Sequence, residues 1–144
     1  MQVDFYILGT ADPAGRLRTA CRLAEKAWQM GHRVYIHTES ARAAAAIDEL
    51  LWTFRQESFV PHAVQGEGPA ADATPLTPVL IGAGEPPSAD LDVLINLTDT
   101  VPLFAERSRR VAEIVGAGEQ ARHAGRERYR HYRDRGCDIR RHDL

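Results

Sequence analysis

The 144-residue sequence has only two cysteines, a single lysine and no long apolar run. Cys21 and Cys137 show neither the spacing of metal ligands nor a secreted disulfide pattern, so we expect a reducing compartment. No apolar stretch approaches the roughly 18 residues of a membrane-spanning helix. The first residues also lack the basic region and apolar stretch of a signal peptide. These absences predict a cytoplasmic protein that makes no contact with a membrane.

The charge of the chain is nearly balanced but unevenly placed. A net charge of -2 argues against a dedicated binder of duplex DNA. From Glu119 onward, however, eight arginines stand against five acidic residues, and this positive end predicts an acidic partner. Hydrophobic residues make up 44% and charged residues 26% of the sequence, as in ordinary globular proteins. The length fits one domain, residues 1–144.

Apolar runs and helical stripes alternate along the chain. Short strand-like runs are expected at 3–8, 33–38, 79–81, 92–97, 110–115 and 137–141, with a turn at 9–15. Apolar positions at helical spacing predict helices over 17–28 and 40–53, a short helix around 102–108 and a long Arg-rich helix over 119–135. This order predicts an α/β fold, a three-layer domain with a mostly parallel, Rossmann-like sheet.

The sequence lacks the motifs of phosphate, metal and nucleophile chemistry. It has no phosphate-binding P-loop, no His-x-x-x-His and no Cys-x-x-Cys. Two loose glycine matches occur. At 66–71 no helix start follows. The match at 116–121 lies between a strand and a helix, but Glu119 would put a carboxylate where a pyrophosphate docks, so it is better explained as a tight strand-to-helix turn. We therefore predict no catalytic residues, no metal and no cofactor.

The last helix presents an arginine-rich face. On a helical wheel, the small residues Ala121, Ala124 and Gly125 fall with Tyr132 on the side that can pack on a sheet, with Arg128 along its edge. The other side gathers Arg122, Arg126, Tyr129, Arg130 and Arg133. A guanidinium matches a carboxylate or phosphate with two hydrogen bonds, and a neighbouring ring adds apolar area. This face suits an acidic peptide with a hydrophobic end or single-stranded nucleic acid, unless it is simply a solvated charged surface.

A second surface is indicated by Trp52 and Phe59. Trp52 lies off the apolar stripe of its helix, on the same side as Asp48, and Phe59 follows in a short segment that continues to Pro61. An indole on a polar helix face often marks a contact site. The alternative is that both rings pack under the adjoining loop.

Several segments, in order along nearly the whole chain, resemble the chi subunit family of bacterial DNA polymerase III holoenzyme. These segments are 4–8, the helix ending at Trp28, 31–34, 47–52, 57–62 continuing to 66–69, 92–97 and 126–133. The resemblance implies an α/β fold like that of nucleotide-binding proteins but without catalysis, which agrees with the missing phosphate loop.

The resemblance also implies two partners. One is the psi subunit, through which chi joins the clamp-loader complex, and the other is the acidic, Phe-terminated tail of single-stranded DNA-binding protein. It implies that Trp52 and Phe59, with the neighbouring Asp48 and Pro61, face psi. Arg122, Arg126, Tyr129 and Arg130 would receive the tail, and Arg133 extends the same face. DNA would then be contacted only indirectly.

Two alternatives stay open at this point. A nucleotide-binding or dinucleotide-dependent enzyme could use the same Rossmann-like sheet, with its ligand near residues 116–120 or at the carboxyl ends of the strands. The arginine face could also bind nucleic acid directly.

Overall fold

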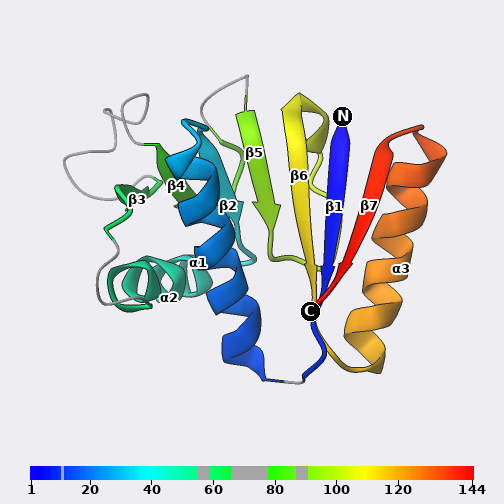
Figure 1. Ribbon diagram of the computed structural model, residues 1–144, viewed down its shortest axis with the longest axis horizontal. Helices are drawn as coiled ribbons and strands as arrows, with labels where there is room; N and C mark the ends of the chain where they lie inside the picture. The colour runs from blue at the N-terminus through cyan, green and yellow to red at the C-terminus, as the bar shows by residue number, and fades with distance from the viewer. Residues whose placement is uncertain (11, 55–58, 66–77, 87–90) are drawn as a thin grey trace.

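A parallel sheet forms the centre of the molecule. The computed structural model describes residues 1–10, 12–54, 59–65, 78–86 and 91–144. These residues form seven parallel strands in the order β3-β4-β2-β5-β6-β1-β7 (Figure 1). The strands are β1 (Gln2–Ile7), β2 (Val34–His37), β3 (His62–Val64), β4 (Val79–Gly82), β5 (Leu91–Asn96), β6 (Ser108–Val115) and β7 (Asp138–Asp143). The prediction of an α/β fold with a parallel sheet is confirmed.

The described helices are α1 (Pro13–Gln29), α2 (Ala41–Thr53), α3 (Glu119–Asp134) and the 3-10 helix η3 (Ala105–Arg107). Two of these helices begin at a side-chain cap. The Asp12 side chain accepts a hydrogen bond from the Ala14 amide ahead of α1, and the Ser40 hydroxyl accepts one from the Ala43 amide ahead of α2. The predicted turn at 9–15 is therefore shorter than expected, because Pro13 occupies the first position of α1, where a missing amide hydrogen costs nothing.

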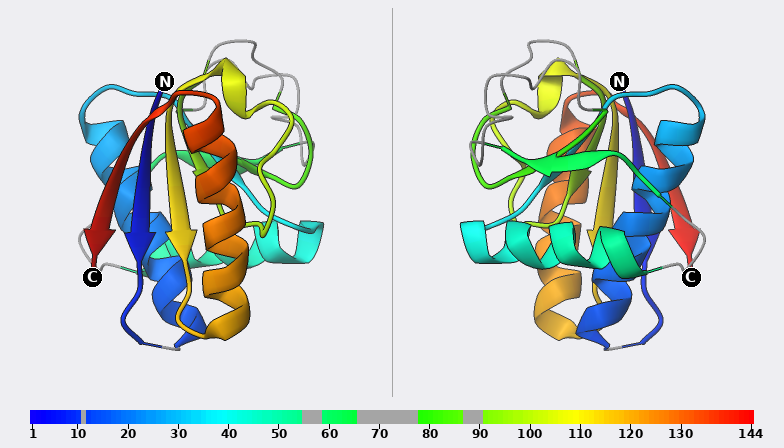
Figure 2. Two further views of the ribbon diagram at one scale, coloured as in Figure 1. Left: turned by 90° about the vertical axis from the view of Figure 1, so that its right-hand side faces the viewer. Right: turned by 90° about the vertical axis from the view of Figure 1, so that its left-hand side faces the viewer.

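Two apolar cores lie on opposite faces of the sheet. Alternate strand residues such as Ile36, Ile95 and Ile114 pack against α1 and α2. Their neighbours on the other face pack with Tyr132 of α3 and with the segment before β6. The helices therefore cover both faces, as Figure 2 shows from the two sides of the molecule.

The order of the strands creates a switch point between β6 and β1. These strands are neighbours, paired from Gln2 and Arg110 to Ile7 and Val115. The chain leaving β1 enters α1 on one face, and the chain leaving β6 enters α3 on the other. In open α/β sheets, ligands bind in the crevice that such diverging connections leave at the carboxyl ends of the strands.

One strand was not predicted. β3 is three residues long, all of them half-buried, and among the described strands it pairs with β4 at the edge of the sheet. A segment this short shows no clear alternation of apolar and polar residues. The glycine-containing segment 66–71, and 57–58 of the family-like motif, lie outside the described residues.

Candidate functional site

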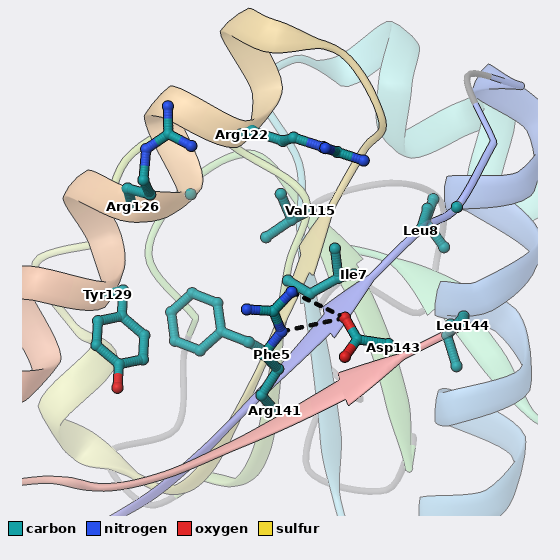
Figure 3. Close-up of a pocket in the computed structure, with 12 residues that line it drawn as sticks. Phe5, Ile7, Leu8, Val115, Arg122, Arg126, Tyr129, Arg141, Asp143 and Leu144 are labelled. Atoms are coloured by element: carbon teal, nitrogen blue, oxygen red, sulfur yellow. Dashed lines mark hydrogen bonds and ion pairs between the residues drawn. The ribbon is translucent and has the colours of Figure 1, made fainter.

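A groove of about 500 Å³ opens at the switch point. Its residues come from the carboxyl ends of β1, β6 and β7 and from the first three turns of α3 (Figure 3). They are Phe5, Ile7, Leu8, Gly9, Val115, Arg122, Gly125, Arg126, Tyr129, Arg141, Asp143 and Leu144. Most of the floor is apolar, whereas most of the charged groups at the walls are arginines. This combination is typical of a site that takes an apolar group and fixes it with a few polar contacts.

Gly125 sets the distance between α3 and the sheet. A β-carbon at this position would lie 2.9 Å from Cγ1 and 3.0 Å from Cγ2 of Val115. Glycine therefore allows the helix to approach β6 more closely than any other residue would. The close approach places the following turn of α3 beside Phe5 of β1, where the floor of the groove forms.

A buried ionic network fixes the rotation of α3. Glu113 of β6 is fully buried and accepts hydrogen bonds from Arg128 Nε at 2.8 Å, from the Tyr132 hydroxyl at 2.7 Å and from Asn96 Nδ2 at 3.0 Å. Burial raises the pKa of Glu113, while the charge of Arg128 and these hydrogen bonds oppose that rise. Burial and the adjacent Glu113 raise the pKa of Tyr132, so its hydroxyl stays a donor. With Arg128 and Tyr132 directed inward, the other faces of α3 leave Arg122, Arg126 and Arg130 exposed.

The network corrects one detail of the sequence interpretation. Arg128 was expected to lie along the edge of the packed face, but only 3% of it is exposed and it pairs with Glu113. The reason is the carboxylate within β6, since an arginine can be buried when a buried partner neutralises it.

Aromatic rings form part of the floor of the groove. Phe5 is 3% exposed, and its ring centroid lies 5.5 Å from that of Tyr129 and 6.1 Å from that of Tyr132. Tyr129 is 42% exposed, so the groove offers one buried ring and one accessible ring. An apolar side chain entering here would contact both.

The cations at the groove differ in their pairing. Within the described part of the chain, the guanidinium groups of Arg122 and Arg126 have no ion pair or side-chain hydrogen bond. Arg141 donates to Asp143 from Nε at 3.1 Å and lies 3.0 Å from it through Nη2. Figure 3 shows Arg122 and Arg126 on the α3 side of the groove and Arg141 with Asp143 on the β7 side. Two unpaired guanidiniums therefore remain to bind an anion.

A second surface lies at the other edge of the sheet. Trp52 of α2 is 53% exposed and Phe59 is 60% exposed, with their ring centroids 5.4 Å apart. Neither ring is packed away, in contrast to the alternative of burial under the adjoining loop. We call Trp52 and Phe59 the aromatic pair. Two large exposed rings in contact form an apolar patch of the kind that marks a protein interface.

His62 packs against the aromatic pair. Its ring centroid lies 4.6 Å from that of Trp52, and its Nε2 lies 3.1 Å from the Asp48 carbonyl oxygen and 3.3 Å from Asp48 Oδ1. Its Nδ1 lies 2.5 Å from the Val60 carbonyl oxygen. These contacts join α2 to the segment that carries Phe59, and so they hold the two rings together.

Comparisons with known proteins place the chain in a family. Residues 1–140 match the model of the DNA polymerase III chi subunit, HolC. A DNA polymerase III subunit chi from Pseudomonas aeruginosa is 43% identical over 143 residues, which cover 99% of this chain and 96% of the relative. Its counterpart from Escherichia coli is 36% identical over 140 residues, covering 94% and 92%. The chain belongs to the DNA polymerase III chi subunit family.

Solved structures of other proteins share only the fold of this chi-family chain. T4 UvsW aligns with a TM-score of 0.66 at 8% identity, over 99% of this chain and 41% of UvsW. The C-terminal domain of the DEAD-box protein Dbp5 aligns with a TM-score of 0.66 at 8% identity, over 98% of this chain and 90% of that domain. These likenesses agree with the α/β fold predicted from the sequence.

The predicted arginine face divides in the structure. Arg122, Arg126 and Tyr129 line the groove together. Arg130 instead pairs with Glu127 at 2.5 Å, and Arg133 pairs with Asp134 at 3.1 Å, both on the exposed side of α3. The groove also contains residues that were not predicted, chiefly Phe5, Val115, Arg141 and Asp143. Val115 and Arg141 stand at the ends of predicted strands, whereas Phe5 lies within one and Asp143 just beyond another, so no local signal brings the four together.

The predicted psi-facing residues lie close together. Trp52, Phe59 and Asp48 contact one another directly or through His62, and Pro61 is half-buried in the same segment. His62 is the residue that sequence reasoning missed here. Its proximity to Trp52 depends on the fold of the segment after α2.

Among the described residues, no group of three or more His, Cys, Asp or Glu side chains could hold a metal ion. None of the described helices combines the length and apolar composition that crossing a membrane requires. The predicted tight turn at 116–121 is present, with Gly118 at a φ of 120° ahead of α3. That φ favours glycine, which explains the second loose glycine match without a ligand.

Proposed function

We propose that this chi-family chain is a non-catalytic accessory subunit of bacterial DNA polymerase III that links two partners. The groove would bind the acidic, Phe-terminated tail of single-stranded DNA-binding protein. The aromatic pair would bind the psi subunit. The chain would thereby connect the clamp-loader complex to coated single-stranded DNA.

One observation carries the tail proposal: the two unpaired guanidiniums of Arg122 and Arg126 flank an apolar groove floored by aromatic rings. A guanidinium accepts no hydrogen bond and pairs well with a carboxylate, so these side chains favour an acidic ligand over a basic one. The rings of Phe5 and Tyr129 favour a ligand whose end is apolar. An acidic chain end with a terminal phenylalanine meets both requirements.

A weak contact at each tail would be sufficient. Many tails lie along one coated strand, and this multiplicity raises the effective concentration of the ligand near each chi-family chain. The proposal therefore does not require a deep, closed pocket.

The tail proposal is tested by titrating a fluorescent acidic peptide that ends in a free phenylalanine. Arg126→Ala should weaken binding by about 1–3 kcal/mol, the value of a hydrogen bond between charged groups. Arg42→Ala is the matched control, because Arg42 is also an exposed helical arginine without an ion pair among the described residues. Binding should fall as salt rises, since the arginines are exposed. Equal affinity of the wild type and Arg126→Ala would refute the tail proposal.

Two further measurements separate the alternatives. Tight binding of a bare single-stranded oligonucleotide would favour direct binding of nucleic acid by the arginines. A rise of several degrees in melting temperature with NAD or ATP would favour a nucleotide site at the switch point. We expect neither ligand to compete with the peptide.

The psi proposal has its own test. Trp52→Ala should abolish co-purification with the cognate psi subunit, because a central exposed indole commonly contributes more than 2 kcal/mol to an interface. Leu103→Ala, which truncates a fully exposed apolar side chain elsewhere, is the control. Peptide binding in the groove should be unchanged in Trp52→Ala. Retention of psi by this variant would count against the assignment.

A further inference from the structure

The edge strand β7 contributes a charged pair to the groove from the side opposite α3. Its parallel register with β1 places Arg141 beside Phe5 and Asp143 beside Ile7. Both side chains line the groove and are about two-thirds exposed. The intervening residue His142 is on the other face of the sheet, where it contacts Asp4. Arg141 is therefore the one residue of β7 that brings a positive charge to this groove.

Asp143 is the only acidic side chain among the residues that line the groove. It shares the groove with Arg122, Arg126 and Arg141, and among the residues that the structure describes its ion pair is with Arg141. An exposed pair two residues apart on an edge strand contributes little to stability. The pair can therefore exchange its carboxylate for that of a ligand at low cost.

We propose that Arg141 is a further binding residue for an acidic chain end and that Asp143 is its positioning residue, holding the guanidinium at the groove until a ligand carboxylate replaces it. This inference rests on the proposed function of the groove. In the free chain, Asp143 accepts a hydrogen bond from Arg141 Nε and so holds the guanidinium at the β7 side of the groove (Figure 3). In the complex, the ligand carboxylate would lie between the arginines of α3 and that of β7.

The exchange has two consequences for binding. Asp143 competes with the ligand for Arg141 and repels other carboxylates, so it lowers the affinity for any acidic ligand. A ligand that supplies a carboxylate at the right position recovers the pairing, whereas a neutral apolar ligand does not. Asp143 therefore increases the preference for an acidic ligand whose carboxylate reaches Arg141 over an acidic ligand whose carboxylate lies elsewhere.

The test is a double-mutant cycle with the fluorescent acidic, Phe-terminated peptide. Arg141→Gln should weaken binding by about threefold to tenfold, and Asp143→Asn should tighten it by a similar factor. In the Arg141→Gln background, the tightening from Asp143→Asn should fall below about twofold, because the residue acts through Arg141. The salt dependence of binding should become steeper in Asp143→Asn, since one more guanidinium is free.

Matched controls come from the same strand. Arg140 and Asp138 are exposed and form only a loose contact at 3.9 Å, and neither lines the groove. Arg140→Gln and Asp138→Asn change the net charge equally and should leave peptide affinity within about twofold of the wild type. Melting temperatures of all variants confirm that β7 remains folded.

Three outcomes would overturn the inference. Unchanged affinity in both Arg141→Gln and Asp143→Asn, with weakening in Arg126→Ala, refutes the role of β7 and leaves the proposed function standing. Equal tightening by Asp143→Asn with and without Arg141 shows simple repulsion rather than exchange. A wild-type chain that does not bind the peptide refutes the proposed function and this inference together.

Discussion

Replacing Glu113 by glutamine should be among the most destabilising isosteric substitutions in this chain. Glu113 is fully buried, and its partner Arg128 is 3% exposed. The substitution removes the negative charge, keeps the shape and leaves the guanidinium buried without a counter-charge. Breaking a buried pair from one side costs about 3–5 kcal/mol, because the remaining charge cannot regain its water. A loss of this size is a large part of the 5–15 kcal/mol typical of a folded domain.

Two comparisons isolate the cause. The pair between Arg135 and Glu106 has a similar separation, 2.6 Å, but both side chains are more than half exposed. Glu106→Gln should therefore cost less than about 1 kcal/mol. In the double variant Glu113→Gln with Arg128→Met, neither charge remains, so the loss should be smaller than the sum of the single losses by about 1–3 kcal/mol.

The measurement is urea unfolding followed by circular dichroism and by tryptophan fluorescence. Coincidence of the two signals establishes two-state behaviour, and a shift of the midpoint at constant slope reports stability alone. If Glu113→Gln cost no more than Glu106→Gln, the network would not be holding α3. If the double variant lost the full sum, the two charges would be acting independently.

Three further outcomes are expected. Burial would raise the pKa of Asp4, but hydrogen bonds from neighbouring side chains outweigh burial and lower that pKa. The stabilisation from Asp4 is therefore present above about pH 4 and lost as the pH falls below it. In Asp4→Asn, the urea midpoint of unfolding should decrease less steeply as the pH is lowered through this range. Burial raises the pKa of Cys21 to about 12, so iodoacetamide at pH 8 should modify the half-buried Cys137 first, as peptide mapping would show. Gly125→Ala should lose about 1–3 kcal/mol by overpacking despite a better helix propensity, and Val115→Ala should restore part of the loss in a melting experiment.

Much of the fold follows from local sequence. The runs over 3–8 and 92–97 are apolar on both faces, as strands covered on both sides require, and both are strands. Ser40 and Gly31 mark a start and an end of helices where expected. β3 could not be predicted, since three half-buried residues show no period.

The site was predictable only where one helix supplies it. Arg122, Arg126 and Tyr129 share a helical face, so their spacing brings them together without knowledge of the fold. Phe5 and Arg141 are far apart in the sequence and meet only because β7 pairs with β1. Arg128 was misplaced because its orientation depends on Glu113, a charged residue within an apolar strand. Contacts of this kind depend on strand order, which no local pattern encodes.

The strand order sets the two surfaces far apart. Seven strands spaced about 4.8 Å make the sheet roughly 29 Å wide from β3 to β7. The aromatic pair lies on α2 and the segment before the edge strand β3, whereas the groove lies between α3 and the strands β6, β1 and β7 at the other edge; Figure 1 shows these elements at opposite sides of the sheet. The Debye length at physiological ionic strength is only about 8 Å, so the charges at one edge are screened before they reach the other. If both proposed partners bind, a rise in salt would therefore weaken the acidic ligand at one edge of the sheet and leave the apolar contact at the other edge largely unchanged.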